Sequence, residues 1–467
     1  YVASWLLALT GSLGVFFAAD LVGFYLLLAL LTVGAAGLVI QSGTPGAWRA
    51  GVVYLMLALA AESAVLGGFV LLAVYTPGDS LLIRDVMAAL PTSPVRAPAL
   101  WLLVAGFGLK AGLFPMHVWM PLAHAAAPIP ASAVLSGAVV KVGIIGLIRF
   151  LPYDTALEGW GELLAMAGLV TALFGVAIGI TQKHPKAVLA YSTVSQMGLV
   201  VAVLGMGLAS GLSTAPLAAA FYASHHVLVK GALFLAVGVA AASGAQISRW
   251  VIVPAAVLAV GLGGLPLTGG AITKYAIKGT LGDGLAGTVS TVSAAATTML
   301  MLHFVVCLRA HGAQDATATA GLGLKLPWAL LGAAALVVPW SLYLGIAVPR
   351  GLLPPVANVA YGFSALWPVL VGLALAGAQW RWGGRIPRIP QGDIAAAIAP
   401  LTRRFIVWGG VVERVDTSLR RWPVAGGARV LDLLGLAAAM STGAWVGSVL
   451  RPTPGENPNL TVPAVIP

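Results

Sequence analysis

Long apolar segments separated by short polar connections run along almost the whole chain. A segment of about 20 apolar residues can cross a bilayer as a helix. By this criterion the predicted spans are 3–18, 21–40, 50–75, 98–113, 130–150, 160–181, 187–207, 215–243, 251–279, 285–309, 327–348, 361–380 and 432–450. Nowhere do apolar and polar residues alternate as in a strand. Because a bilayer core tolerates only helices and closed barrels, we predict an all-α, polytopic membrane helical bundle.

Two of these segments contain helix breakers. The first reads GLKAGLFPMHVWMPLAHAAAPIP, with Pro115 and Pro121 in its middle, and the second reads GLGGLPLTGGAITK, with Pro266 among glycines. A proline interrupts the helical hydrogen-bond ladder, and free backbone groups at membrane depth are tolerated where they line a polar cavity. A broken helix in each half of the chain is typical of an inverted-repeat transporter. A simple packing kink is the alternative.

The two ends of the chain differ from the middle. The segment 381–431 is basic with interleaved apolar residues, which predicts a helix lying along the membrane surface. A last membrane helix and a proline-rich tail are expected over 432–467. The chain begins with Tyr1 inside an apolar run, so we expect the natural N-terminus to precede this sequence.

Composition supports a membrane protein: 60% of residues are hydrophobic and only 8% are charged, whereas soluble domains have about 25% charged residues. The net charge of +11 lies largely in short connections and towards the C-terminus, so it does not indicate nucleic-acid binding. The single cysteine, Cys307, excludes a disulfide framework or an iron–sulfur site built from this chain alone.

Loop charges favour one orientation. The loops expected on one side of the membrane contain Arg49, Lys183, Lys186, Arg249, Arg309, Lys325, Arg381, Arg385 and Arg388. The loops expected on the other side contain Arg84, Arg96, Arg149, Lys278 and Arg350. The positive-inside rule places the first, larger set in the cytoplasm.

Four lysines lie inside apolar stretches, namely Lys110, Lys141, Lys230 and Lys274. A lysine at the centre of a membrane helix costs about 3 kcal/mol. Four of them indicate a function that needs buried, titratable amines to pass a charge along.

Glu62 is the only carboxylate deep in a predicted helix. Burial favours a neutral carboxyl group, whereas a neighbouring ammonium favours the carboxylate, so a Glu62–lysine pair would titrate as a coupled unit. A protonated Glu62 that hydrogen-bonds two helices together is the alternative. Asp20, between the first two spans, is expected to cap a helix N-terminus.

Histidines accompany the lysines. His226 precedes Lys230 by four residues, so both would lie on one helix face. A neutral imidazole donates at one nitrogen and accepts at the other, and can therefore pass protons between waters. His303 is interpreted as a hydrogen-bond partner. We find no metal-binding, nucleotide or dinucleotide motif, and expect neither a metal nor a cofactor.

Several blocks of the chain resemble, in the same order, the antiporter-like membrane subunits of respiratory complex I, Mrp-type antiporters and membrane-bound hydrogenases. They are GFGLKAGLFPMHVWMPLAHAAAPIPASAVLSGAVVKVGIIGLIRF, KAVLAYSTVSQMGLV, HHVLVKGALFLAVG and GLPLTGGAITKYAIK. The PLAHAAAP and LSGAVVK stretches are most similar to the large membrane subunits of hydrogenase-4 and formate hydrogenlyase.

The resemblance implies two inverted five-helix repeats, each with a broken helix, and a C-terminal surface helix. The implied domains are a first repeat over 1–150, lacking its preceding N-terminal helices, a second over 151–310, further membrane helices over 311–380, the surface segment 381–431 and the last helix and tail 432–467. Lys110 would load protons, Lys141 and Lys230 with His226 would connect the halves, and Lys274 would be the terminal site.

Two positions depart from the family pattern. Ala29 stands where the family usually has a glutamate that modulates the first lysine, and Leu122 replaces the acid of a PDAH motif. The first change puts standard pumping in doubt. We predict that Glu62 takes over that glutamate's role and approaches Lys110 directly or through one water.

The leading hypothesis is a proton-translocating subunit of a multi-subunit energy-converting complex in the bacterial inner membrane. Protons, rather than Na⁺, would move along an axis formed by Lys110, Lys141, His226, Lys230 and Lys274, with Glu62 beside it. The chain has no catalytic centre of its own, so partner subunits or an ion gradient must drive it, as in an NADH:quinone oxidoreductase or a membrane-bound hydrogenase. The alternative is a non-pumping subunit that anchors a partner enzyme or conducts protons to it, for example for CO₂ hydration and bicarbonate uptake.

Overall fold

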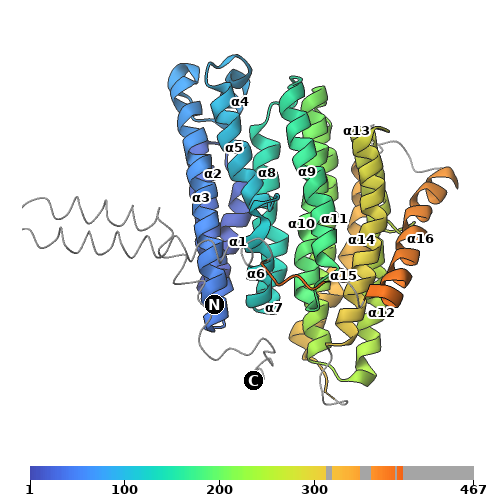
Figure 1. Ribbon diagram of the computed structural model, residues 1–467. Helices are drawn as coiled ribbons and strands as arrows, with labels where there is room; N and C mark the ends of the chain where they lie inside the picture. Colours follow the sequence, from blue (N-terminus) through green and yellow to red (C-terminus); the bar gives the residue numbers. More distant parts are fainter. Residues whose placement is uncertain (312–317, 348–358, 384–386, 393–467) are drawn as a thin grey trace, which may run out of the picture. The chain divides into compact units, whose positions relative to one another are not determined.

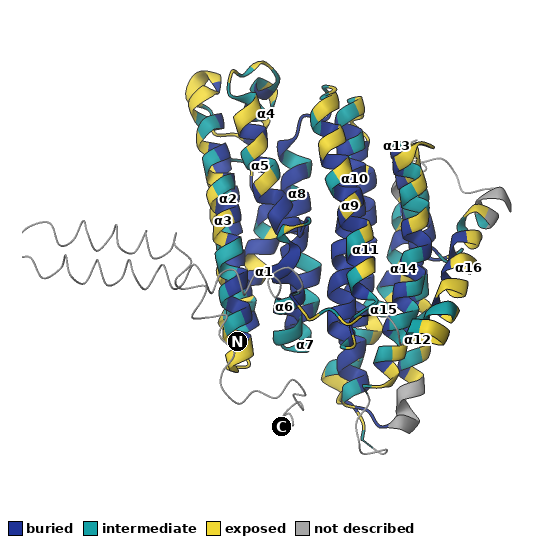
Figure 2. Ribbon diagram, viewed as in Figure 1, coloured by how far each residue is buried: buried dark blue, intermediate teal, exposed yellow. Residues whose placement is uncertain are grey.

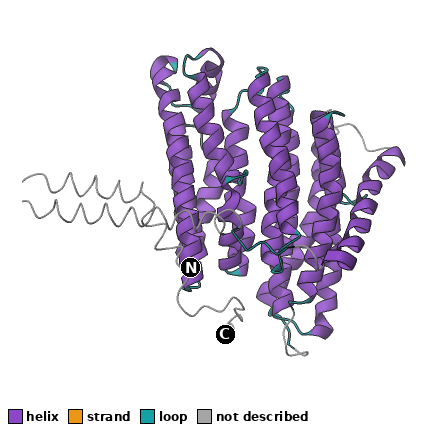
Figure 3. Cartoon of the chain, viewed as in Figure 1, coloured by secondary structure: helices purple, strands orange, loops and turns teal. Residues whose placement is uncertain are grey.

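Helices and their connections make up the part of the protein that the computed structural model describes, residues 1–311, 318–347, 359–383 and 387–392 (Figures 1 and 3). Within it no strand forms, and one isolated backbone pair joins Asp20 to Leu82. Nine helices of this part are long and apolar enough to cross a membrane. The predicted all-α polytopic membrane fold is confirmed.

The first half of the bundle contains eight α-helices. They are α1 (Val2–Phe17), α2 (Leu21–Ile40), α3 (Pro45–Tyr75), α4 (Ile83–Ala89), α5 (Arg96–Ala111), α6 (Trp119–Ala126), α7 (Ile129–Val134) and α8 (Val140–Phe150). Short 3-10 turns lie at η1 (Pro77–Asp79), η2 (Leu90–Thr92) and η3 (Met116–Val118), and a π-turn, η4 (Leu135–Val139), joins α7 to α8.

The second half continues with six helices. They are α9 (Glu158–Gly179), α10 (Pro185–Ser210), α11 (Ala215–Ala241), α12 (Ala245–Gly263), α13 (Gly269–Leu281) and α14 (Leu285–Arg309). Two further helices follow, α15 (Leu322–Leu342), extended by the π-turn η5 (Tyr343–Ala347), and α16 (Val359–Trp382). The predicted surface segment 381–431 falls largely outside the described residues, and the predicted span 432–450 lies entirely outside them.

Local sequence sets where the early helices begin. The Asp20 carboxylate accepts a hydrogen bond from the Gly23 amide at 2.7 Å, which confirms the predicted helix cap. Thr44 caps α3 in the same way, and Pro45 follows it in the first turn, where a missing amide proton has no cost.

The two halves repeat one pattern of helix packing. In the first half α1 packs on α2, α2 on α3, α3 on both α5 and α6, and α5 on α8. In the second half the same relations hold for α9 with α10, α10 with α11, α11 with α12 and α13, and α12 with α14. In each half, five helical segments therefore follow one another, and the fourth is broken, into α5 and α6 or into α12 and α13. Since five is odd, the second half starts from the opposite side and is inverted, as predicted. The predicted domain boundaries stay predictions.

Both predicted helix breaks are present. The helix α5 ends at Gly112, whose φ of 78° lies in the left-handed region, and the chain resumes as helix only at Met116. The helix α12 ends at Gly264, with φ of 111°, and α13 starts after Leu267, which also has a positive φ. Such conformations favour glycine, so the ends of α5 and α12 at Gly112 and Gly264 follow directly from the sequence, whereas the positive φ of Leu267 does not.

The helices α9 and α10 are held together by small residues. A Cβ atom added to Gly168 would lie 2.5 Å from the backbone of Gly198 and Ala202, and one added to Gly175 would lie 2.6 Å from the Ser195 amide. Such close backbone approach is the way membrane helices associate without a hydrophobic driving force. The result is a central helix, α10, that is buried along nearly its whole length (Figure 2).

Candidate functional site

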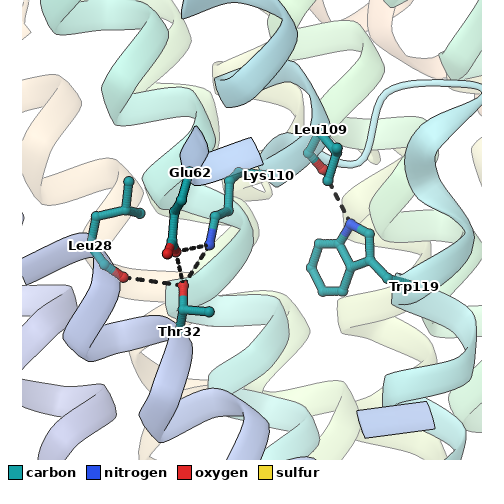
Figure 4. Close-up of polar contacts among 6 residues, drawn as sticks. All are labelled: Leu28, Thr32, Glu62, Leu109, Lys110 and Trp119. Carbon is teal, nitrogen blue, oxygen red and sulfur yellow. Dashed lines mark hydrogen bonds and ion pairs between the residues drawn. The ribbon is translucent and has the colours of Figure 1, made fainter. Parts of the chain in front are cut away.

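Lys110 forms a closed polar cluster with Glu62 and Thr32 at the end of α5 (Figure 4). Its Nζ atom donates to Glu62 Oε1 at 2.7 Å and to Thr32 Oγ1 at 2.5 Å. The Thr32 hydroxyl also contacts Glu62 Oε1 and the Leu28 carbonyl. The side chains of Lys110 and Glu62 are 3% and 5% exposed. The predicted approach of Glu62 to Lys110 is confirmed as a direct ion pair.

The local sequence brings these three side chains together. A Cβ atom at Gly106 would lie 2.6 Å from the carbonyl oxygen of Ala61, so this glycine lets α5 approach α3 next to Glu62. Just beyond Lys110 the helix breaks, and the Trp119 indole donates to the Leu109 carbonyl at 3.2 Å (Figure 4). The indole thereby satisfies a carbonyl that the end of the helix would leave free.

Lys141 is buried near the start of α8, two residues after the π-turn η4. Its Nζ donates to the Ser136 carbonyl at 2.6 Å and lies 2.7 Å from His226 Nδ1. A charged lysine ammonium has no lone pair and can only donate. When Lys141 is charged, His226 Nδ1 is therefore the acceptor. Since Lys141 is in the first half and His226 in the second, this contact joins the two halves.

Lys230 is fully buried on α11 and donates to the Leu189 carbonyl of α10 at 3.1 Å. His226 is one turn away on the same helix, as predicted, but its recorded hydrogen bond is to Lys141. The Nε2 atom of His226 has no hydrogen-bond partner among the described residues. Both lysines and the histidine are thus concentrated where α8, α10 and α11 meet.

Lys274 lies after the second break, on α13. Its Nζ is 3.5 Å from the Tyr222 hydroxyl and 5.8 Å from the centre of that ring. The Tyr222 hydroxyl donates to Gln196 Oε1, and the Gln196 amide donates to Thr297 Oγ1 at 2.9 Å. Tyr222, Gln196 and Thr297 are uncharged residues. Among the described residues Lys274 has no carboxylate partner.

These contacts form three separate groups. The first contains Lys110 with Glu62 and Thr32, the second Lys141 with His226 near Lys230, and the third Lys274 with Tyr222 and Gln196. Within the described residues, no direct hydrogen bond joins one group to the next. Whether they form one continuous axis therefore stays a prediction.

The structure corrects the assignment of Lys186 to a loop. Its side chain is buried near the start of α10 and donates to the carbonyls of Ala125 and Ala127 at 3.0 and 2.7 Å. It thereby satisfies carbonyls at the end of α6. The sequence placed it at the edge of an apolar run, and no signal there marked it as buried.

His184 caps α10 outside the membrane-spanning helices, and its ring lies 5.0 Å from that of His311. Burial, then the positive charge of Lys186 and the neighbouring His311, lower the pKa of His184 to about 4. This histidine is therefore neutral at physiological pH.

Two further histidines make contacts away from the buried lysines. His303 Nε2 lies 2.7 Å from the Gln182 carbonyl, which confirms its interpretation as a hydrogen-bond partner. His124 stacks on Phe234 with ring centres 4.7 Å apart. No group of three or more histidine, cysteine or acidic side chains suited to a metal occurs in the part of the chain described.

Comparisons with known proteins show what the chain is similar to. Residues 18–301 match the family model described as NADH:quinone oxidoreductase/Mrp antiporter, membrane part. The chain is 36% identical to hydrogenase-4 component B of Escherichia coli over 227 residues, which cover 46% of this chain and 33% of that protein. It is 35% identical to NADH-quinone oxidoreductase subunit N of Desulforudis audaxviator over 245 residues, covering 51% of this chain and 48% of that one.

The fold is also similar to a solved structure. A chain of the Mrp complex from Dietzia superposes with a TM-score of 0.71 at 22% identity, over 96% of this chain and 52% of the other. In each of these comparisons the match spans about half or less of the relative's length.

Proposed function

Because the chain belongs to the NADH:quinone oxidoreductase/Mrp antiporter membrane family, we propose that it is a proton-translocating subunit of a multi-subunit energy-converting complex. The observation that carries this proposal is the contact between Lys141 and His226. It places two titratable groups, one from each half, within hydrogen-bond distance inside a membrane bundle. Such intramembrane ionisable groups are characteristic of proton pathways.

The chemistry of each group suits this role. A lysine amine passes a proton only if it can exist in both charged and neutral forms, and burial brings these forms closer in energy. His226 can accept at Nδ1 and donate at Nε2, so a proton entering from Lys141 can leave on the other side of the ring. Waters between the three groups would complete the path from Lys110 to Lys274.

Glu62 supplies the acidic partner for Lys110 that Ala29 cannot provide. The Glu62 carboxylate contacts Lys110 from α3, whereas the family glutamate would lie on α2 at the position of Ala29. Thr32 on α2 hydrogen-bonds both Glu62 and Lys110. The first lysine therefore keeps an acidic partner. This observation favours active translocation over the alternative of a subunit that anchors or feeds a partner enzyme.

The chain depends on partners in this proposal. We expect partner subunits to supply the driving energy, because hydrogenase-4 component B and NADH-quinone oxidoreductase subunit N are named as parts of larger assemblies, and the similar solved structure is that of an Mrp complex. We place it in the bacterial inner membrane among other membrane subunits. Protons fit better than Na⁺, because Glu62 is the single carboxylate among the buried polar residues of the described part.

Replacement of Lys230 by arginine tests the proposal. Arginine keeps the positive charge but does not release its proton, so Lys230→Arg should abolish proton transport by the complex in reconstituted vesicles while assembly persists. Lys183→Arg, at an exposed lysine, is the matched control and should transport normally. Wild-type transport in Lys230→Arg would remove Lys230 from the path. Uptake of radiolabelled sodium coupled to a pH change would overturn the choice of protons.

A further inference from the structure

The two lysines at the helix breaks have different surroundings. Lys110 is closed off and paired with Glu62. Lys274, in contrast, lines a cavity of about 180 Å³ bounded by α12, α13, α14 and α16. Its aliphatic stem lies over Gly264, where a Cβ atom would come within 3.0 Å of Lys274 Cδ. The glycine that ends α12 thus makes room for the side chain that reaches the cavity.

The cavity concentrates hydrogen-bond donors. Lys278 lines it one turn beyond Lys274, so two ammonium groups project from one face of α13. Ser290 of α14 lines the opposite wall, and its hydroxyl has no recorded partner in the described part of the chain. The neighbouring Thr291 hydroxyl is already used, since it donates to the Gly287 carbonyl at 3.0 Å.

Negative charge is missing from this lining. Neither an aspartate nor a glutamate is among the described residues that border the cavity. The nearest partner of Lys274 is the neutral Tyr222 hydroxyl. Lys274 is half-buried and Lys278 is exposed, and neither has a fixed counterion among the described residues. Two such cations side by side attract an anion from solution.

We propose that this cavity, between Lys274, Lys278 and Ser290, is a binding site for a small inorganic anion of the size of chloride or bicarbonate. The anion accepts hydrogen bonds from the two ammonium groups and the serine hydroxyl, and serves Lys274 as the exchangeable counterpart of Glu62 at Lys110. The cavity has room for such an ion with a few waters. Trp367 and Pro368 of α16 close its apolar side.

Equilibrium binding of radiolabelled chloride to the purified full chain tests the site. The chain is placed in nanodiscs of phosphatidylcholine, which carries no net charge, in a gluconate buffer at neutral pH. The wild type should show saturable, single-site binding that bromide and bicarbonate displace and gluconate does not. The order of displacement by bromide and bicarbonate identifies which anion the site prefers. Linear, non-saturable uptake would overturn the proposal.

Three variants assign the binding to this cavity. Lys278→Gln and Ser290→Ala should each weaken chloride binding ~tenfold, because each removes a donor to a charged group. Lys278→Arg should retain binding. Lys278 is exposed, so its replacement leaves the packing intact. Unchanged affinity in Lys278→Gln would overturn the proposal, as would an equal loss in the control Lys183→Gln.

The binding measurement uses no proton gradient and no partner subunit. Its outcome is therefore independent of whether the chain translocates protons.

Discussion

At the scale of single residues, the Glu62–Lys110 pair is the most consequential contact, because each charge is buried and depends on the other. Removal of one partner of such a pair costs about 3–5 kcal/mol. We therefore expect Glu62→Gln and Lys110→Ala each to lower the unfolding free energy strongly in detergent. The double variant should lose less than the sum. Strictly additive losses would contradict the coupling.

Thr32 connects both members of that pair and gives a second residue-scale prediction. Thr32→Val keeps the shape of the side chain but removes the hydroxyl that contacts Lys110 and Glu62. A hydrogen bond to a charged group contributes about 1.5–3 kcal/mol, so the thermal midpoint should fall clearly. Thr288→Val is the control, because that exposed hydroxyl bonds only a carbonyl of its own helix start. Equal effects of the two substitutions would argue against the bridging role.

His184 predicts how stability depends on pH. Its pKa is about 4 in the folded protein, against an ordinary value of 6.5. Between these values the unfolded chain binds a proton that the folded chain does not, so acidification from pH 6.5 to 4 destabilises the fold. His184→Asn retains a side chain that can cap α10 and should show a shallower acid dependence in thermal unfolding. An unchanged slope would exclude His184 as its source.

Some of these residues could be predicted from the sequence and others could not. The Glu62–Lys110 pair followed from a missing family glutamate at Ala29 and one remaining buried acid. Thr32 lies three residues after Ala29, on the same helix face, and this spacing could have indicated it. Lys186 had no such signal, because its burial depends on the carbonyls at the end of α6, far away in sequence.

At the scale of helices, glycines decide how closely α9 and α10 pack. Glycine to alanine normally stabilises a helix by up to about 1 kcal/mol, and Gly159→Ala should do so, since nothing lies within 4 Å of its added Cβ. Gly168→Ala should instead destabilise by about 1–3 kcal/mol, because its Cβ would meet the backbone of α10. Thermal unfolding in detergent compares them. The same sign of change in both variants would refute the packing argument.

The helices themselves were largely predictable, because apolar length and the proline and glycine clusters mark where they run and where they break. The π-turn η4 was not predictable. Its residues, Leu135–Val139, contain no proline, and the single glycine, Gly137, does not by itself indicate a π-turn. Within this turn the Ser136 carbonyl accepts a hydrogen bond from the Lys141 side chain, a contact that no local pattern shows.

At the scale of the whole molecule, the hydrogen bond between Lys141 and His226 joins an ionisable group of the first half to one of the second half. We expect His226→Asn to keep an acceptor near Lys141, since the amide oxygen can replace Nδ1, but to pass no proton. Transport in vesicles should therefore stop while the thermal midpoint changes little. Transport at the wild-type rate would show that protons bypass His226.

The burial of α10 has a consequence for how the protein is made. Its polar residues Ser192, Thr193, Ser195 and Gln196 are fully enclosed by helices that precede and follow it in the chain. The ribosome completes α10 before α11 and α14 exist, so during synthesis these side chains face lipid, the translocon or an insertion chaperone. A nascent chain that stops before α14 leaves Gln196 without the Thr297 hydroxyl. The pairing of the Gln196 amide with Thr297 therefore marks the point in synthesis at which the core around α10 is complete.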